Sequence, residues 1–320
     1  MDKAIEVKHL DKRFGAVHAV NDVSFGVGHG DVLGFLGPNG AGKSTTMKMI
    51  TGFMEPSGGT VRVCGYDVLE QPIKAKQKIG YLPEGAPGYG EMTPTGFLNF
   101  IAEVRGLLEP QKSERIADVV QKIHLETVME RAIETLSKGF RRRVGLAQAI
   151  LHDPEVLIMD EPTDGLDPNQ KHEVRTLIGD MAKDKAIVIS THILEEVDAV
   201  CNRAIIIADG RLVFSGTPAE LEAQSRVHNA VSLSLKTEHA TSARSHLQQL
   251  EYVAEIEELG CTEDGTHLLI LPRDGHSIVD KISHAVHENG WEVGELHVQP
   301  GRLDEVFRSI TTKAGQQTLT

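Results

Sequence analysis

The chain has 320 residues, 40% of them hydrophobic and 25% charged, which is ordinary for a globular protein and leaves room for one large and one small domain. Its 33 basic and 46 acidic side chains give a net charge of −13, which argues against nucleic-acid binding and a polybasic membrane anchor, because both need clustered Lys and Arg. The cysteines Cys64, Cys201 and Cys261 lie far apart without CxxC spacing, which favours reduced thiols over disulfides or a metal site.

Short β-rich runs alternate with helical stretches up to about residue 222, which predicts an α/β domain with a largely parallel sheet. A helix is predicted at Ser44–Ile50, and further helices cluster at about 95–150, where we predict a mainly helical subdomain. The predicted core strands are Val32–Leu36, Glu155–Met159, Ala186–Ser190 and Ala204–Ala208. No run approaches the roughly 18 apolar residues of a membrane span, and the N-terminus lacks the apolar core of a signal peptide.

Residues 223–320 have a different pattern, which predicts a separate accessory domain. The predicted strands and helices follow the order β-α-β-β-α-β, the split arrangement of ferredoxin-like α+β domains. A last helix is predicted at Leu303–Thr311. The predicted elements before it are Ala230–Leu235, Thr241–Leu250, Val253–Leu259, His267–Leu271, Ser277–Glu288 and Trp291–Val298.

Residues 37–45 read GPNGAGKST and match the phosphate-loop pattern GxxxxGK[ST] directly after a predicted strand. The glycines let the backbone turn its N–H groups toward one anion, and the following helix adds its positive dipole end. Lys43 is predicted to reach the β- and γ-phosphates of ATP, and the Ser44 hydroxyl to bind Mg²⁺. The predicted ATP-binding residues of this loop are Gly37, Pro38, Asn39, Gly40, Ala41, Gly42, Lys43, Ser44 and Thr45. The fold class is therefore that of a P-loop NTPase.

An apolar run, residues 156–159, ends in the adjacent carboxylates Asp160 and Glu161. At the carboxyl edge of a parallel sheet, Asp160 is predicted to hold Mg²⁺. Glu161 follows by one residue and is predicted to accept a proton from the attacking water.

Further motifs carry a resemblance to the nucleotide-binding domains of ABC transporters. Residues 136–140 read LSKGF and resemble the LSGGQ signature, with Ser137 and Gly139 matching and Lys138 and Phe140 departing. Residues 164–168, DGLDP, resemble the D-loop, and residues 190–192, STH, resemble the H-loop. Residues 12–15, KRFG, resemble the A-loop, whose aromatic ring stacks on adenine.

The resemblance covers roughly residues 4–218 and implies roles for single side chains. Phe14 would stack on adenine, and His192 would steady the γ-phosphate as a catalytic residue beside Glu161 and Lys43. Two copies would pair head to tail as a homodimer, with Ser137, Gly139 and Asp167 reaching the ATP that is bound to the other copy.

Glu84 occupies the place where family members usually carry a glutamine that touches Mg²⁺ and the transport partner. The surrounding residues 81–84, YLPE, and the C-terminal run 301–307 resemble ATP-binding subunits of ABC-2 type exporters, including the gliding-motility-related group. The resemblance implies ABC-2 type transmembrane permease subunits as partners. It also implies a cytoplasmic location, peripheral on the inner face of the membrane. A solvated loop carboxylate is the alternative for Glu84.

Other readings stay open at this point. A soluble ABC ATPase acting on ribosomes would normally carry two such domains, and a DNA-repair ATPase would carry a long coiled coil within residues 46–135. A metabolic P-loop kinase would not need the signature or the D-loop. The residues after 223 could instead form a regulatory binding module. The run Arg141–Arg143 is predicted to be a solvated helix face rather than a nucleic-acid patch.

Overall fold

The computed structural model describes residues 3–85, 89–262 and 265–317, and its contacts divide the chain into two compact units. Unit 1 comprises Met1–Pro218 with Thr311–Thr320, and unit 2 comprises Ala219–Ile310. The predicted boundary between residues 222 and 223 stays a prediction. In the described part of the chain, no helix is both long and apolar enough to cross a membrane.

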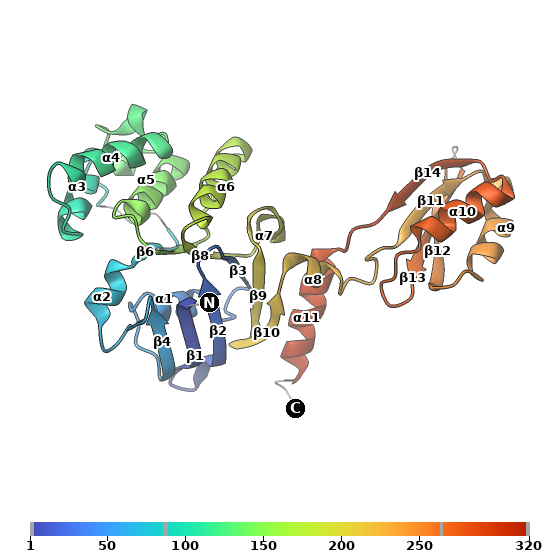
Figure 1. Ribbon diagram of the computed structural model, residues 1–320, viewed down its shortest axis with the longest axis horizontal. Helices are drawn as coiled ribbons and strands as arrows, with labels where there is room; N and C mark the ends of the chain where they lie inside the picture. Colours follow the sequence, from blue (N-terminus) through green and yellow to red (C-terminus); the bar gives the residue numbers. More distant parts are fainter. Residues whose placement is uncertain (1–2, 86–88, 263–264, 318–320) are drawn as a thin grey trace. The chain divides into compact units, whose positions relative to one another are not determined.

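Unit 1 is built on a six-stranded sheet in the order β10-β9-β3-β8-β7-β6 and a four-stranded antiparallel sheet in the order β2-β1-β4-β5. Figure 1 shows α1 and the four-stranded sheet on one face of the six-stranded sheet and α3–α6 on the other. The strands are β1 Lys3–Phe14, β2 Val17–Gly28, β3 Val32–Leu36, β4 Gly58–Val63, β5 Tyr66–Asp67, β6 Ile79–Leu82, β7 Val156–Asp160, β8 Ala186–Thr191, β9 Arg203–Ala208 and β10 Arg211–Gly216.

The helices of unit 1 include the predicted cluster between residues 95 and 150. They are α1 Lys43–Ile50, α2 Pro72–Gln77, α3 Pro94–Val104, α4 Gln111–Lys122, the 3₁₀ helices η1 Glu126–Val128 and η2 Ile133–Thr135, α5 Lys138–Ile150, α6 Pro168–Ala182 and α7 Leu194–Val200, and α8 Pro218–Glu222 runs across the boundary of the two units. Several begin at a capping side chain: Ser137 accepts from the Phe140 amide, and Asp167 accepts from the Gln170 amide.

The three central strands β3, β7 and β8 are buried along their whole length. Their sequences VLGFL, VLIMD and AIVIST are largely continuous apolar runs, because elements cover both faces of a parallel sheet. The last two runs end in polar residues. β7 pairs in parallel with β6 and β8, which brings the ends of these strands to one edge. The predicted α/β fold of a P-loop NTPase is confirmed, and its candidate site lies at that edge.

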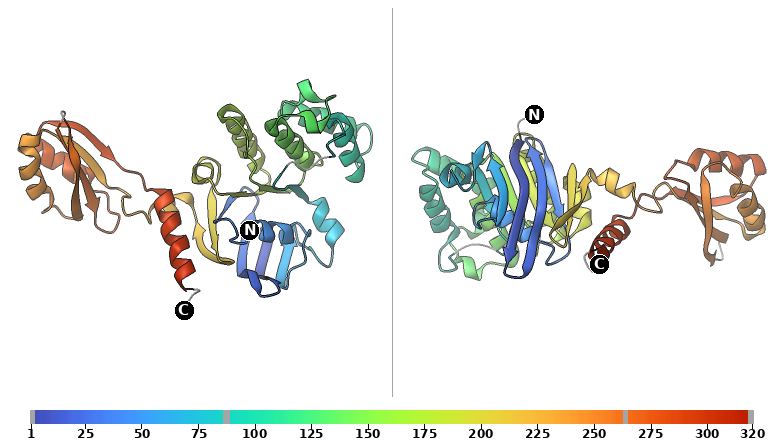
Figure 2. Two further views of the ribbon diagram at one scale, coloured as in Figure 1. Left: turned by 180° about the vertical axis from the view of Figure 1, so that it is seen from behind. Right: turned by 90° about the horizontal axis from the view of Figure 1, so that it is seen from below.

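Unit 2 has the predicted split β-α-β-β-α-β order, with an antiparallel sheet in the order β12-β13-β11-β14. Both helices lie against this sheet (Figure 2). One core joins the sheet to the helices, and its buried residues include Leu247 and Ile282. The first helix begins at Thr237, earlier than predicted, because its first turn carries polar residues that give no periodic signal. The elements are β11 Val231–Leu235, α9 Thr237–Leu247, β12 Val253–Thr262, β13 Gly265–Pro272, α10 Val279–Asn289 and β14 Val293–Val298. The last helix, α11 Leu303–Gln317, begins in unit 2 and ends in unit 1.

Candidate functional site

The phosphate loop joins β3 to α1, and its glycines are required by close backbone packing. A Cβ on Gly37 would lie 2.4 Å from the Ile207 carbonyl oxygen. Gly42 has a φ of 105°, and a Cβ there would lie 2.5 Å from the Ala19 carbonyl oxygen of β2. Any larger residue would therefore push the loop away from β9 or β2.

Lys43 starts α1 and points its ammonium group back into the loop. Its side chain is 7% exposed, and Nζ donates to the carbonyl oxygens of Gly37 at 2.6 Å and Pro38 at 3.2 Å. Burial lowers the pKa of Lys43, and the charges of Glu161 and other carboxylates oppose that effect. In the described residues no carboxylate forms an ion pair with it. A buried cation with neutral partners fits an anionic ligand such as a triphosphate.

The end of β7 presents two carboxylates, and each has a partner from the end of β8. Asp160 is 3% exposed and accepts a hydrogen bond from the Ser190 hydroxyl. A carboxylate oxygen of Glu161 lies 2.8 Å from Nδ1 of His192. The structure therefore brings the predicted metal ligand, base and γ-phosphate residue to one edge of the sheet.

Glu161 sits in an environment that disfavours its charge. Burial raises the pKa of Glu161, while the His192 hydrogen bond and the Lys43 charge oppose the rise. A raised pKa suits a group that takes up a proton during a reaction.

The residues expected to hold ATP and Mg²⁺ have suitable chemistry. Asp160 offers a carboxylate, and the half-buried Ser44 starts α1 beside Lys43. The described residues contain no group of three or more His, Cys, Asp or Glu that forms a metal cage. Mg²⁺ fits this set because it is commonly held by one or two carboxylates together with substrate phosphates.

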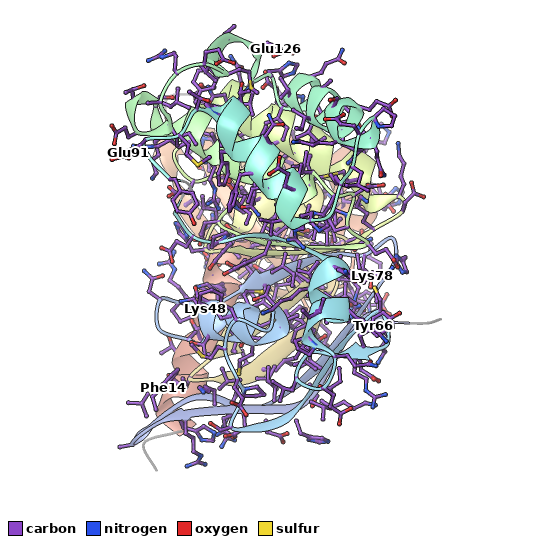
Figure 3. The ribbon with its side chains drawn as sticks, turned by 90° about the vertical axis from the view of Figure 1, so that its left-hand side faces the viewer. Phe14, Lys48, Tyr66, Lys78, Glu91 and Glu126 are labelled. Atoms are coloured by element: carbon purple, nitrogen blue, oxygen red, sulfur yellow. The ribbon has the colours of Figure 1, made fainter. Side chains whose placement is uncertain are left out.

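Phe14 is the last residue of β1, on the four-stranded sheet and away from the carboxylates at the end of β7. β1 pairs with β2, and Ala19 of β2 lies against Gly42 of the phosphate loop. Its ring is 48% exposed at the end of β1, with the Lys12 ammonium 5.1 Å from the ring centroid. Figure 3 shows Phe14 at the outer edge of this sheet. An exposed ring at this place is available for stacking.

The structure does not place the predicted residues Ser137, Gly139 and Asp167 beside Lys43 of the same chain. Ser137 and Asp167 are exposed N-caps of α5 and α6, and Gly139 is buried against Gln170 and Leu166. Both helices lie across the six-stranded sheet from α1 (Figure 1). Glu84 is exposed, yet its negative charge acts on the Lys43 ammonium.

The prediction of a solvated face at Arg141–Arg143 was wrong. Arg142 and Arg143 are 5% and 7% exposed. Arg143 donates to the Ile123 carbonyl and to Glu173, and Arg142 donates to carbonyl oxygens at the catalytic edge, including that of Glu161 at 2.6 Å. Protein acceptors replace water at the Nη atoms of both guanidinium groups, while the Nε atom of each is buried without a partner.

Sequence reasoning also missed the polar side chains behind the catalytic edge. The buried Glu196 of α7 accepts hydrogen bonds from the hydroxyls of Thr163 and Thr191. These threonines follow Glu161 by two residues and precede His192 by one. Their position beside motif residues was the available signal.

Comparisons with known proteins agree with this geometry. The family model "ABC transporter" matches residues 20–164. The chain is 30% identical over 308 residues to the linearmycin resistance ATP-binding protein LnrL of Bacillus subtilis (strain 168), and the match covers 96% of this chain and 98% of that protein. The chain belongs to the ABC transporter family.

Two further matches bear on this ABC transporter protein. It is 38% identical over 225 residues to the probable multidrug ABC transporter ATP-binding protein YbhF of Escherichia coli (strain K12), spanning 70% of this chain but 39% of the length of that relative. A solved ATP-binding subunit of an ABC transporter superposes with a TM-score of 0.65 at 33% identity, covering 69% of this chain and 92% of that one. ATP hydrolysis is the activity of this family's ATP-binding domain.

Proposed function

We propose that this chain is the ATP-hydrolysing subunit of an ABC-2 type exporter, working as a homodimer against transmembrane permease subunits on the inner face of the membrane. The observation that carries the ATPase role is the Glu161–His192 pair at 2.8 Å beside the buried Lys43. The exporter role draws on relatives whose names describe multidrug transport and linearmycin resistance.

In the proposed reaction, Lys43 binds the β- and γ-phosphates and offsets the charge that develops on them. Mg²⁺ held by Asp160 and Ser44 would neutralise further phosphate charge. Glu161 accepts a proton from the attacking water, and the 2.8 Å contact with His192 fixes the orientation of its carboxylate.

The homodimer accounts for the residues that lie away from Lys43. Ser137, Gly139 and Asp167 lie at the starts of α5 and α6, across the sheet from α1. Head-to-tail pairing of two copies would place these residues of one copy on the ATP of the other, in a two-fold interface with two ligands.

An apolar groove with a cationic rim supports the permease as partner. The groove has a volume of about 1030 Å³ and runs between α1, α2 and α3, with Lys48 of α1 labelled in Figure 3. Phe53, Ile73 and Val104 line it and are 76%, 71% and 66% exposed. Isolated apolar residues are ordinary on a surface, but a grouped set of this exposure marks an interaction site.

The charges of the groove indicate the chemistry of the segment that it receives. Lys48, Lys76 and Arg105 line it, and within the described residues none of them forms an ion pair. Arg105 donates to the carbonyl oxygens of Lys76 at 2.8 Å and Ile79 at 3.3 Å. In a chain with a net charge of −13, these cations favour an amphipathic permease segment that carries apolar side chains and a carboxylate.

The test of the ATPase role is Glu161→Gln in the full chain. Turnover should fall by about 100-fold or more while ATP binding is retained, because the amide cannot take up the proton. Glu155→Gln is the matched control, since Glu155 lies just before the other end of β7 and pairs with Lys78. Near-normal turnover in Glu161→Gln, or equal losses in both variants, would exclude Glu161 as the base.

The test of the partner is stimulation of ATP hydrolysis by the purified permease, compared with ribosomes and DNA. Val104→Glu should abolish permease stimulation, because it places a negative charge in the groove that would repel the carboxylate of the permease segment. Leu108→Glu is the control, because Leu108 is 76% exposed and does not line the groove. Stimulation by ribosomes or DNA but not by the permease would contradict the exporter role and indicate a soluble ABC ATPase.

A further inference from the structure

Arg142 is a buried cation on α5, two residues after the signature run 136–140. Its guanidinium has no carboxylate oxygen within 4.0 Å in the described part of the chain. The nearby negative charges that act on it belong to Asp160, Asp164, Glu161 and Glu84. A buried guanidinium without a direct counter-ion must be satisfied by hydrogen bonds.

Those hydrogen bonds reach two segments that are far apart in the sequence. Nη1 donates to the carbonyl oxygens of Pro83 at 2.7 Å and Gly85 at 3.2 Å, on either side of Glu84. Nη2 donates to the carbonyl oxygens of Asp160 and, at 2.6 Å, of Glu161. A planar fork can hold both segments at once, whereas an ammonium group is a single point of attachment.

The Glu161 backbone needs such a restraint. Its φ is 52°, in the left-handed region, which is unfavourable for a residue with a side chain. Its amide donates to the Ser190 carbonyl at 2.9 Å, and its carbonyl accepts from Arg142. The two contacts hold the peptide groups on both sides of the strained residue, which aims the carboxylate at His192.

We propose that Arg142 is a positioning residue for ATP hydrolysis, which holds Glu161 in its strained conformation and ties it to the segment around Glu84. Because Pro83 also lines the apolar groove, Arg142 connects the surface proposed for the permease to the base by two sets of hydrogen bonds. This inference rests on the proposed role of Glu161.

The experiment measures steady-state MgATP hydrolysis by the isolated full chain. Arg142→Lys keeps the charge but loses the fork, and should lower kcat by about 10- to 100-fold, the effect of a small misplacement of a reacting group. KM, ATP affinity and Tm should stay near wild-type values. Arg143→Lys is the matched control, because Arg143 is the next residue, is equally buried and bonds Ile123 and Glu173 instead. It should leave kcat at the wild-type value.

A double-mutant cycle separates positioning from general stability. If Arg142 acts through Glu161, Arg142→Lys should cause no further loss of kcat in a Glu161→Gln background. Additive losses, or an equal fall of kcat in Arg143→Lys, would overturn the proposal. Arg142→Gln gives a second, neutral variant, and loss of fold in both Arg142 variants would assign this residue to stability instead.

Failure of the proposed base gives a different result. Near-normal turnover in the single variant Glu161→Gln would refute the proposed role of Glu161 as the base. Slow turnover in that variant together with additive losses removes only the role of Arg142.

Discussion

Leu233 tests whether unit 2 unfolds independently of the ATP-binding core. It lies in β11, is 0% exposed, and is paired with Leu268 on β13 and Leu296 on β14. The Leu233→Ala change should cost about 2–5 kcal/mol, since it removes buried methyl groups and leaves a cavity. A unit of this length has a total stability of roughly 5–14 kcal/mol, so the change removes a large part of it.

The assay is differential scanning calorimetry of the full chain with and without MgATP. We expect two transitions, because the cores of the two units consist of different residues. A cost of 2–5 kcal/mol should lower the transition of unit 2 by at least about 8 °C, at roughly 4–8 °C per kcal/mol. MgATP at about 100 times its Kd should stabilise only unit 1, by about 2.7 kcal/mol.

Leu259→Ala is the matched control, because Leu259 has the same side chain on β12 but is 60% exposed. Its effect should stay within about 0.5 kcal/mol, as for other surface changes. A single transition that responds both to MgATP and to Leu233→Ala would refute the reasoning, since the two units would then unfold as one.

Three further predictions concern the candidate site. Phe14→Ala should weaken ATP binding by roughly 5- to 150-fold, the loss expected for base–aromatic stacking, whereas Phe14→Tyr should bind ATP like the wild type. Equal affinities of Phe14→Ala and the wild type in a fluorescent-nucleotide titration would contradict stacking. Burial raises the pKa of Glu161, and the base acts when it is ionised. As the pH is lowered, kcat/KM should therefore fall with an apparent pKa above the ordinary glutamate value. Full activity down to about pH 4.3 would show that no raised pKa controls the reaction. Glu84→Gln should slow the isolated subunit no more than a few-fold but weaken permease-stimulated hydrolysis, because we expect Glu84 to pair with a basic group of the permease and the amide would lose that charge-assisted contact. The opposite pattern would make Glu84 a Mg²⁺-site residue.

The core strands could be predicted because their burial shows directly in the sequence. β7 and β8 are continuous apolar runs, and each ends in the polar residues that form the site. Asp160 and Glu161 could therefore be placed at the edge of the sheet from the sequence, and the resemblance to the H-loop added His192. The 2.8 Å contact of Glu161 with His192 could not be predicted, because it depends on a left-handed φ that no sequence pattern marks.

Arg142 shows why the rest of the site was not predictable. Charged side chains on a helix are mostly solvated, so adjacent arginines give no sign that two of them are buried. The acceptors of Arg142 are backbone carbonyl oxygens, and every residue has one. Only the packing of α5 against the ends of β6 and β7 selects which carbonyls it meets.

Lys138 is a second residue whose place the sequence left open, since it departs from the family signature. Its ammonium lies 2.8 Å from Asp164, and a Cβ on Gly165 would lie 2.4 Å from the Lys138 side chain. The lysine therefore lies over a D-loop glycine, whose φ of 74° and missing side chain leave the room. The pair is exposed and contributes little to stability, but it joins the signature loop to the D-loop.

The segment after β7 is thus held by buried charges of two helices, one of which also holds the end of β8. Arg142 of α5 binds the carbonyl oxygen of Glu161, and Glu196 of α7 accepts from Thr163 and Thr191. A shift of the segment after β7 alone would break hydrogen bonds to both buried charges, which is costly because neither charge can be hydrated in the interior. A displacement of Pro83 at the groove would therefore act on the strained backbone of Glu161 through the hydrogen bonds of Arg142.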